Sequence, residues 1–122
     1  MNDLIGIPYR RGASGPDAID CWGLVRLACQ RVHGTALPAL VDRVAPVVRG
    51  ASRQGWRPVD LPRPGDILVM RSAAGIRHTG FVLRVRHRLE MLHAIEGGSV
   101  CQPVSDLPLM GFHHIKAWRL TT

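Results

Sequence analysis

The 122-residue sequence contains no long apolar run, no internal repeat and no low-complexity tract. None of its apolar stretches approaches the roughly 18 residues that a membrane-spanning helix needs, so we expect no membrane insertion. The start, Met1–Gly6, has no basic leader, so we expect no signal peptide, and delivery by another component if the protein acts outside the cytoplasm. The length predicts one domain over residues 1–122. Hydrophobic residues make up 46% of the chain, which is enough for a modest core.

Cysteines and histidines lack the spacings of disulfide frameworks and structural metal sites. The chain has three cysteines, Cys21, Cys29 and Cys101, and no two of them are close in sequence. An odd number at these spacings argues against a disulfide framework and against a C-x-x-C zinc site. The six histidines show no H-x-x-x-H or H-E-x-x-H spacing. The adjacent His113 and His114 would point to opposite faces of a strand. We therefore expect no metal site.

Negative charge is scarce, with 9 Asp+Glu against 16 Lys+Arg and a net charge of +7. The arginines are scattered and the only lysine is Lys116. Without a basic tail or the aromatic and glycine pattern of an RNA-binding sheet, nucleic acid is a weak alternative, and its binding would fall steeply with salt. An anionic cell-envelope polymer or an acidic neighbouring subunit would fit the excess of positive charge equally well. Part of this excess is expected to be ordinary solvent-exposed surface charge.

The first half of the sequence predicts a loop followed by a helix. Residues 5–19 contain the glycines and prolines of a loop, and Asp20 is a suitable helix N-cap. From Cys21 onward, apolar residues recur at helical spacing until a C-cap glycine, Gly34. Residues 40–50 predict a second, weaker helix that contains Pro46.

The second half predicts short strands. The strand-like runs cover residues 67–70, 78–85, 89–95, 100–104 and 114–120, with a polar turn region over 84–88. A helix followed by a meander of strands indicates an α+β protein with an antiparallel sheet of about five strands.

Cys21 combines with two histidines to suggest thiol chemistry. It opens the predicted helix, and His78 and His93 each lie in a strand-like run. A helix N-terminus favours the thiolate, and an imidazole can take and return the proton. Taken singly, each residue also has a structural explanation, since buried cysteines and histidines are common in cores.

Four motifs occur in the order found in a known family. They are Pro8-Tyr9-Arg10-Arg11-Gly12-Ala13-Ser14-Gly15-Pro16-Asp17-Ala18-Ile19-Asp20-Cys21-Trp22-Gly23-Leu24-Val25, then Pro64-Gly65-Asp66, His78-Thr79-Gly80 and Leu92-His93-Ala94. In this order they resemble the NlpC/P60 family of papain-like cysteine peptidases of bacterial cell walls, over nearly the whole chain. The resemblance implies an α+β fold in which an N-terminal helix carrying the cysteine packs on the sheet.

The resemblance also implies roles for individual residues. Cys21 resembles the nucleophile, His78 the base and His93 the third residue, which orients the base. Tyr9 matches a tyrosine that lines the active site, and Asp20 matches a residue that helps recognise the free amine of a stem peptide. Asp20 is also fully explained as an N-cap, and the Cys21 backbone amide is a candidate oxyanion donor. No metal or organic cofactor is implied.

We expect structural roles for the remaining cysteines and histidines and for Trp56 and Trp118. We expect Cys29 to pack in the core and Cys101 to be a buried free thiol. Trp56 and Trp118 are expected in the core. The histidines expected at the surface or in turns are His33, His87, His113 and His114.

Trp22 departs from the pattern of wall-cutting enzymes, which commonly carry serine after the nucleophile. The motif Asp20-Cys21-Trp22-Gly23-Leu24-Val25-Arg26 resembles tail-assembly proteins of bacteriophages and gene-transfer particles, and a large indole would reshape the substrate pocket. We therefore expect a phage-tail-associated peptidase that cleaves peptidoglycan stem peptides, is made in the host cytoplasm, resides in the virion tail tip and contacts other tail-tip or hub proteins. The alternatives are a structural tail component with an inactive site and a papain-like amidase or acyltransferase.

Overall fold

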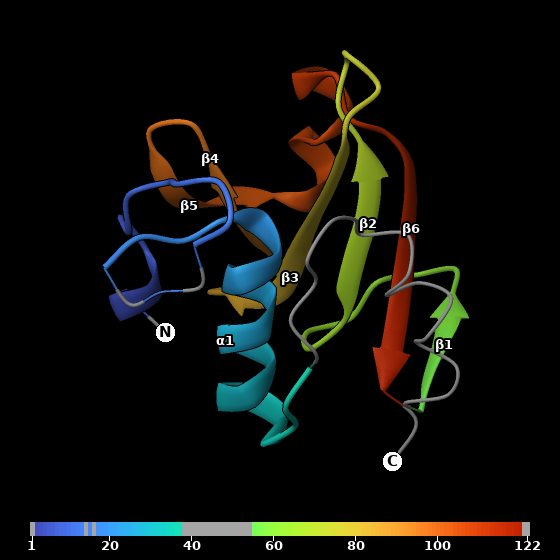
Figure 1. Ribbon diagram of the computed structural model, residues 1–122. Coiled ribbons are helices and arrows are strands. Elements are labelled where there is room, and N and C mark those ends of the chain that lie inside the picture. Colours follow the sequence, from blue (N-terminus) through green and yellow to red (C-terminus); the bar gives the residue numbers. More distant parts are fainter. Residues whose placement is uncertain (1, 14, 16, 38–54, 121–122) are drawn as a thin grey trace.

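The computed structural model describes residues 2–13, 15, 17–37 and 55–120, and within them one α-helix packs against one face of an antiparallel sheet (Figure 1). The helix is α1 (Cys21–His33). The strands are β1 (Trp56–Val59), β2 (Ile67–Arg71), β3 (Arg77–Val85), β4 (Arg88–Ile95), β5 (Gly98–Pro103) and β6 (His113–Leu120). Short 3-10 helices are η1 (Asn2–Leu4), η3 (Val104–Asp106) and η4 (Pro108–Met110).

Helix α1 has the two caps that the sequence predicts. The Asp20 carboxylate accepts a hydrogen bond from the Gly23 backbone N–H at 2.7 Å, which satisfies one of the free donors of the first turn. The helix ends at Gly34, which adopts a left-handed conformation with φ of 66° and donates to the Gln30 carbonyl. The second carboxylate oxygen of Asp20 accepts from the Gly12 N–H at 3.2 Å, so one side chain fixes both the helix start and the preceding loop.

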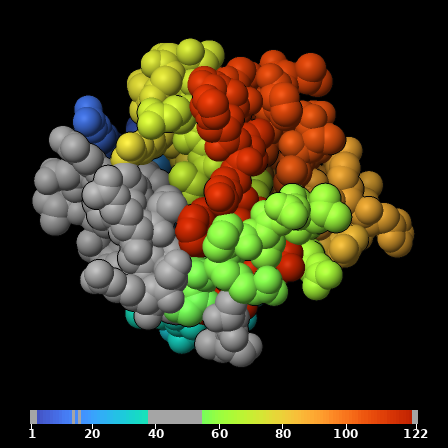
Figure 2. Space-filling view, turned by 90° about the vertical axis from the view of Figure 1, so that its right-hand side faces the viewer, coloured from blue at the N-terminus to red at the C-terminus, as the bar shows by residue number. Residues whose placement is uncertain are grey.

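The sheet has six strands in the order β1-β6-β2-β3-β4-β5. The last strand lies between β1 and β2, and Figure 2 looks onto this side of the molecule, where β1 (green) borders β6 (red). Asp66, which is almost fully buried just before β2, accepts hydrogen bonds from the Arg119 guanidinium of β6 at 3.0 and 2.9 Å. This ion pair joins the start of β2 to the end of the chain.

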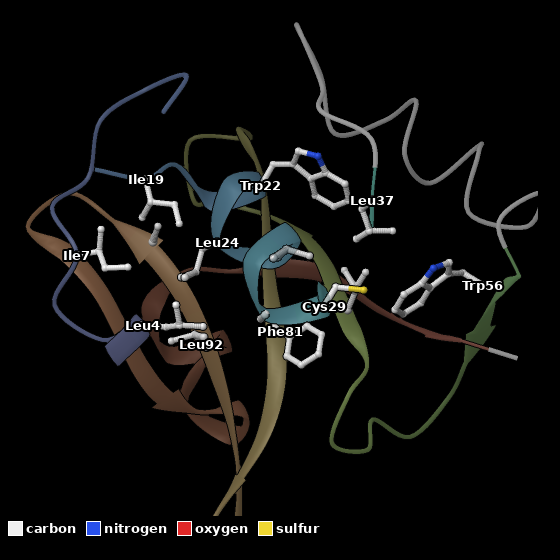
Figure 3. Packing of buried hydrophobic residues seen from close by; sticks show 14 residues of the cluster. Leu4, Ile7, Ile19, Trp22, Leu24, Cys29, Leu37, Trp56, Phe81 and Leu92 are labelled. Atoms are coloured by element: carbon white, nitrogen blue, oxygen red, sulfur yellow. The ribbon is translucent and has the colours of Figure 1, made fainter. Parts of the chain in front are cut away.

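Two hydrophobic clusters cover the two faces of the sheet. Figure 3 shows the first cluster, in which Leu24 and Cys29 of the helix pack against Phe81 and Leu92 of the sheet. The second cluster holds Leu68, Met70, Val82, Met91, Leu107 and Ala117. Leu107 lies between η3 and η4, so these short helices cover the face that α1 leaves open.

The N-terminal segment is tied to the sheet by Ser99 of β5. Its buried hydroxyl accepts from the Ile7 N–H at 2.9 Å and donates to the Leu4 carbonyl at 2.6 Å. This places the loop that precedes α1 against the far edge of the sheet.

The predicted α+β class, helix and five strand runs are confirmed, with two differences. The sheet has six strands, one more than predicted. The strand missed is β1, which has only four residues, including Pro58, and so shows too short a pattern to detect in the sequence. The turn predicted over 84–88 was too long, since only Arg86 and His87 form it. The exposed arginines there do not end the strands, because their side chains face solvent. The second predicted helix, over 40–50, lies outside the described residues.

No helix in the described ranges is long and apolar enough to cross a membrane.

Candidate active site

Cys21 is the first residue of α1 and is half-buried. Burial raises the pKa of its thiol, and the nearby Asp20 charge raises it further. The hydroxyl and backbone of Thr79 and the backbone of Trp22 lower this pKa in part. The Thr79 hydroxyl lies close enough to lower this pKa, although within the described residues it makes no hydrogen bond of standard geometry.

The position of Cys21 at the helix start does not by itself create a thiolate. A helix N-terminus favours the thiolate, but loss of hydration outweighs that effect here and the pKa of Cys21 is raised. The resting sulfur is therefore a neutral thiol near pH 7.

The structure brings the two predicted histidines together. Nε2 of His78 lies 2.8 Å from Nδ1 of His93, a hydrogen bond between β3 and β4. Phe112 holds both rings, stacking on His78 at 4.9 Å between centroids and meeting His93 edge-on at 6.0 Å. The backbone pairing of β3 with β4 ends at Phe81 and Leu92, so side chains rather than backbone connect the strands at the histidines.

Both imidazoles are kept neutral by their surroundings. Burial, with the His93 charge as a smaller cause, lowers the pKa of His78 to about 3. Burial also lowers the pKa of His93, although its hydrogen bond to Gln102 acts in the opposite direction. A neutral imidazole has one unprotonated nitrogen and can serve as a base at neutral pH.

Gln102 of β5 is a member of this cluster that sequence reasoning missed. Its Oε1 lies 2.6 Å from Nε2 of His93, which is fully buried. The sequence predicts a strand there, but the register that sets Gln102 opposite Met91, diagonal to His93, cannot be read from one strand alone.

Cys21 is not joined to the histidines by a hydrogen bond in this structure. It meets β3 at Thr79, the residue directly after His78. The structure therefore unites His78, His93 and Gln102, and places the sulfur beside the same end of β3. Catalytic hydrogen bonds are often loose in unliganded enzymes and shorten when substrate is bound.

The three residues predicted to bind substrate lie around the helix start. Tyr9 is 40% exposed, and its pKa is raised by burial and then by the charges of Cys21 and Asp20, which places it near the sulfur. Asp20 uses both carboxylate oxygens to cap α1 and hold Gly12. Trp22 has only 5% of its surface exposed and belongs to the helix-side cluster in Figure 3, so its position supports packing more directly than substrate contact.

Other predicted structural roles have mixed outcomes. Cys29 and Trp56 are buried in the core, as predicted, and Cys101 is a free thiol that is only half-buried. His33 was expected at the surface or in a turn, but its Nε2 lies 2.8 Å from the Gly65 carbonyl and its ring packs on Trp56. The ring of His33 is therefore half-buried between the last turn of α1 and the sheet. Among the described residues, no group of three or more His, Cys, Asp or Glu is arranged to hold a metal ion.

Comparison with known proteins identifies the family. The family model described as "NlpC/P60 family" matches residues 6–119, which is nearly the whole chain. The chain belongs to the NlpC/P60 family. The resemblance inferred from the four motifs is thereby confirmed at the level of the family, a family of cysteine peptidases and cell-wall hydrolases.

Solved structures share the NlpC/P60 fold with this chain. The NlpC/p60 domain of the peptidoglycan hydrolase SagA has a TM-score of 0.63 and 22% identity, over 95% of this chain and 89% of that one. An N-acetylmuramoyl-L-alanine amidase from Bacteroides uniformis has a TM-score of 0.65 and 11% identity, over 99% and 95% of the two chains. At these identities the likeness concerns the fold. Among curated proteins, no sequence matches this chain.

Proposed function

We propose that this NlpC/P60 protein is a cysteine peptidase that hydrolyses an amide bond in the peptide stem of peptidoglycan. The observation that carries the proposal is the hydrogen-bonded pair His78–His93, which lies next to Thr79, the point where Cys21 meets the sheet. The relative SagA, named a peptidoglycan hydrolase, supports the choice of substrate.

In the proposed reaction, Cys21 attacks the amide carbonyl while His78 takes the thiol proton. The tetrahedral intermediate collapses as the C–N bond breaks, and the proton passes from His78 to the leaving amine. The acyl group remains on Cys21 as a thioester. Water then attacks this thioester with His78 as base, which releases the carboxylic acid and restores the thiol.

The neutral resting state determines when the proton moves. The raised pKa of Cys21 and the lowered pKa of His78 both oppose a preformed thiolate–imidazolium pair. Proton transfer therefore accompanies attack on the bound substrate. The Cys21 backbone N–H at the start of α1 is the proposed donor to the oxyanion.

We further propose that the enzyme acts from a phage tail tip, as a virion component in contact with tail-tip or hub proteins. The support is the segment Asp20–Arg26, with Trp22 after the nucleophile, which resembles tail-assembly proteins. The protein would be made in the host cytoplasm and would cut the wall as the tail crosses it. Immunogold labelling of particles tests this location, and label absent from purified tails would contradict it.

A second candidate function is a structural tail component with an inactive site. The observation that favours it is that no hydrogen bond joins Cys21 to His78, although both residues are described. Substrate-free geometry of this kind is compatible with either function, so activity decides between them.

Digestion of defined muropeptides tests the proposed activity. We expect the wild-type protein to release peptide fragments that mass spectrometry identifies, and Cys21→Ala to release none while its circular dichroism is unchanged. Cys101→Ala is the matched control, since Cys101 is also a half-buried free thiol, and it should retain activity. Equal cleavage by Cys21→Ala would overturn the mechanism, and an inert wild type would favour the structural role.

A further inference from the structure

The hydrogen-bonded chain of the site does not end at the second histidine. It runs from His78 Nε2 to His93 Nδ1 at 2.8 Å, and from His93 Nε2 to Gln102 Oε1 at 2.6 Å. The three side chains come from β3, β4 and β5, and Phe112 packs against both rings. The ring planes are therefore held, and the arrangement of protons is the remaining variable.

With the Gln102 amide oxygen facing His93, as in this structure, counting protons along this chain leaves one consistent arrangement. An amide oxygen can only accept, so His93 must carry its single proton on Nε2 and donate it to Gln102. Nδ1 of His93 is then unprotonated and accepts the Nε2–H of His78. The single proton of His78 is thus on Nε2, which leaves its Nδ1 as an unprotonated base.

The counting requires that both rings carry one proton each. Burial lowers the pKa of both His78 and His93, so both are neutral at pH 7. The nitrogen-to-nitrogen contact excludes the case in which both rings are doubly protonated, because one proton fits between the two nitrogens and two would repel.

The opposite arrangement would disable the base. If His93 carried its proton on Nδ1, it would donate to His78, and the proton of His78 would move to Nδ1. With the amide oriented as it is here, His93 Nε2 would then set its lone pair against the oxygen of Gln102 at 2.6 Å, which is repulsive; relief would require the amide to turn over and present its NH2 group. The orientation of the Gln102 amide therefore selects between an active and an inactive arrangement, through the intervening His93.

We propose that Gln102 is a positioning residue that fixes the tautomers of His93 and His78 and so leaves Nδ1 of His78 free to accept the Cys21 proton. The catalytic part of this inference rests on the proposed peptidase function. The tautomer part concerns the resting protein and can be measured without substrate.

Substitutions at Gln102 separate this role from packing. Gln102→Met keeps a similar volume but removes the acceptor oxygen, so both tautomers of His93 become accessible. Gln102→Glu keeps an acceptor oxygen and should retain the wild-type tautomers. Gln30→Met, on the exposed surface of α1, removes a glutamine amide elsewhere and is the matched control.

The first measurement is ¹⁵N NMR of the histidine rings, which distinguishes protonated from unprotonated Nδ1 and Nε2. We expect wild type, Gln102→Glu and Gln30→Met to show His78 and His93 protonated on Nε2, and Gln102→Met to show a mixture. Wild-type protein with His78 protonated on Nδ1, or unchanged tautomers in Gln102→Met, would overturn the proposal.

The second measurement is steady-state cleavage of the muropeptide. Gln102→Met should lower kcat by roughly twofold or more, in proportion to the inactive tautomer that NMR detects, with little change in KM, because that part of the population lacks the base. Gln102→Glu should retain activity at pH 8 but lose it at a higher pH than wild type on acidification, because a carboxylate favours protonated His93. If the tautomers are as expected but wild type cleaves nothing, the peptidase function fails while the role of Gln102 in fixing the tautomers stands.

Discussion

At the scale of single residues, the site depends on burial more than on formal charge. Cys21 begins a helix, where a thiolate is favoured, yet its pKa is raised because burial removes part of the water around the sulfur. His78 is affected in the opposite sense, with its pKa lowered to about 3. The two shifts together give a neutral thiol and a neutral imidazole in the resting protein, so in the proposed mechanism the proton moves only when substrate is bound.

The lowered pKa of His78 predicts activity at acidic pH. As the pH falls, His78 stays unprotonated until the solution approaches its pKa of about 3, well below the ordinary value of 6.5. We expect the acid limb of kcat/KM against pH to lie clearly below pH 6.5. The exposed His87 serves as control, and His87→Gln should leave the profile unchanged. An acid limb near pH 6.5 would contradict a buried neutral base.

At the scale of elements, the helix and the strands could be predicted because local sequence patterns determine them. The caps at Asp20 and Gly34 and the apolar alternation of the strands are local signals, and the structure confirms the helix and the strand runs. The pairing of β1 with β6 and the diagonal placement of Gln102 depend on register between distant segments, which no single strand contains. The site was therefore predicted as far as its two histidines and not as far as their partner on β5.

The cap of α1 gives a test at this scale. Asp20→Ala removes the bonds to both Gly23 and Gly12, so we expect a loss of about 1–2 kcal/mol in the free energy of unfolding, measured by urea denaturation. Asp20→Asn keeps an acceptor and should lose less. The matched control is Asp17→Ala, which changes an exposed aspartate in the same loop and should have a small effect. Equal losses in the two alanine variants would show that the cap contributes little.

At the scale of the whole molecule, burial of neutral histidines makes stability depend on pH. The unfolded chain binds protons at His78 with a pKa near 6.5, whereas the folded chain resists protonation down to about pH 3. Between these values the unfolded state holds more protons, so stability is complete above pH 6.5 and declines as the pH falls. The net charge of +7 adds self-repulsion that grows in the same direction.

Unfolding at two pH values isolates the histidine contribution. For His78 alone we expect stability to fall by about 2 kcal/mol between pH 7 and pH 5. His78→Gln cannot titrate there, so its stability should fall less over the same range, while the general charge effect is shared by both proteins. Parallel declines in wild type and His78→Gln would mean that His78 is readily protonated in the folded protein.

The most direct test of the account is to capture the covalent intermediate. Wild-type protein mixed with a defined muropeptide, quenched in acid within milliseconds to seconds and analysed by intact-protein mass spectrometry, should gain the mass of the acyl fragment minus one hydrogen. Peptide mapping should place that adduct on Cys21, and Cys21→Ala should show none. Hydrolysis of the muropeptide without an adduct, together with full activity of Cys21→Ala, would contradict a peptidase that works through this thiol.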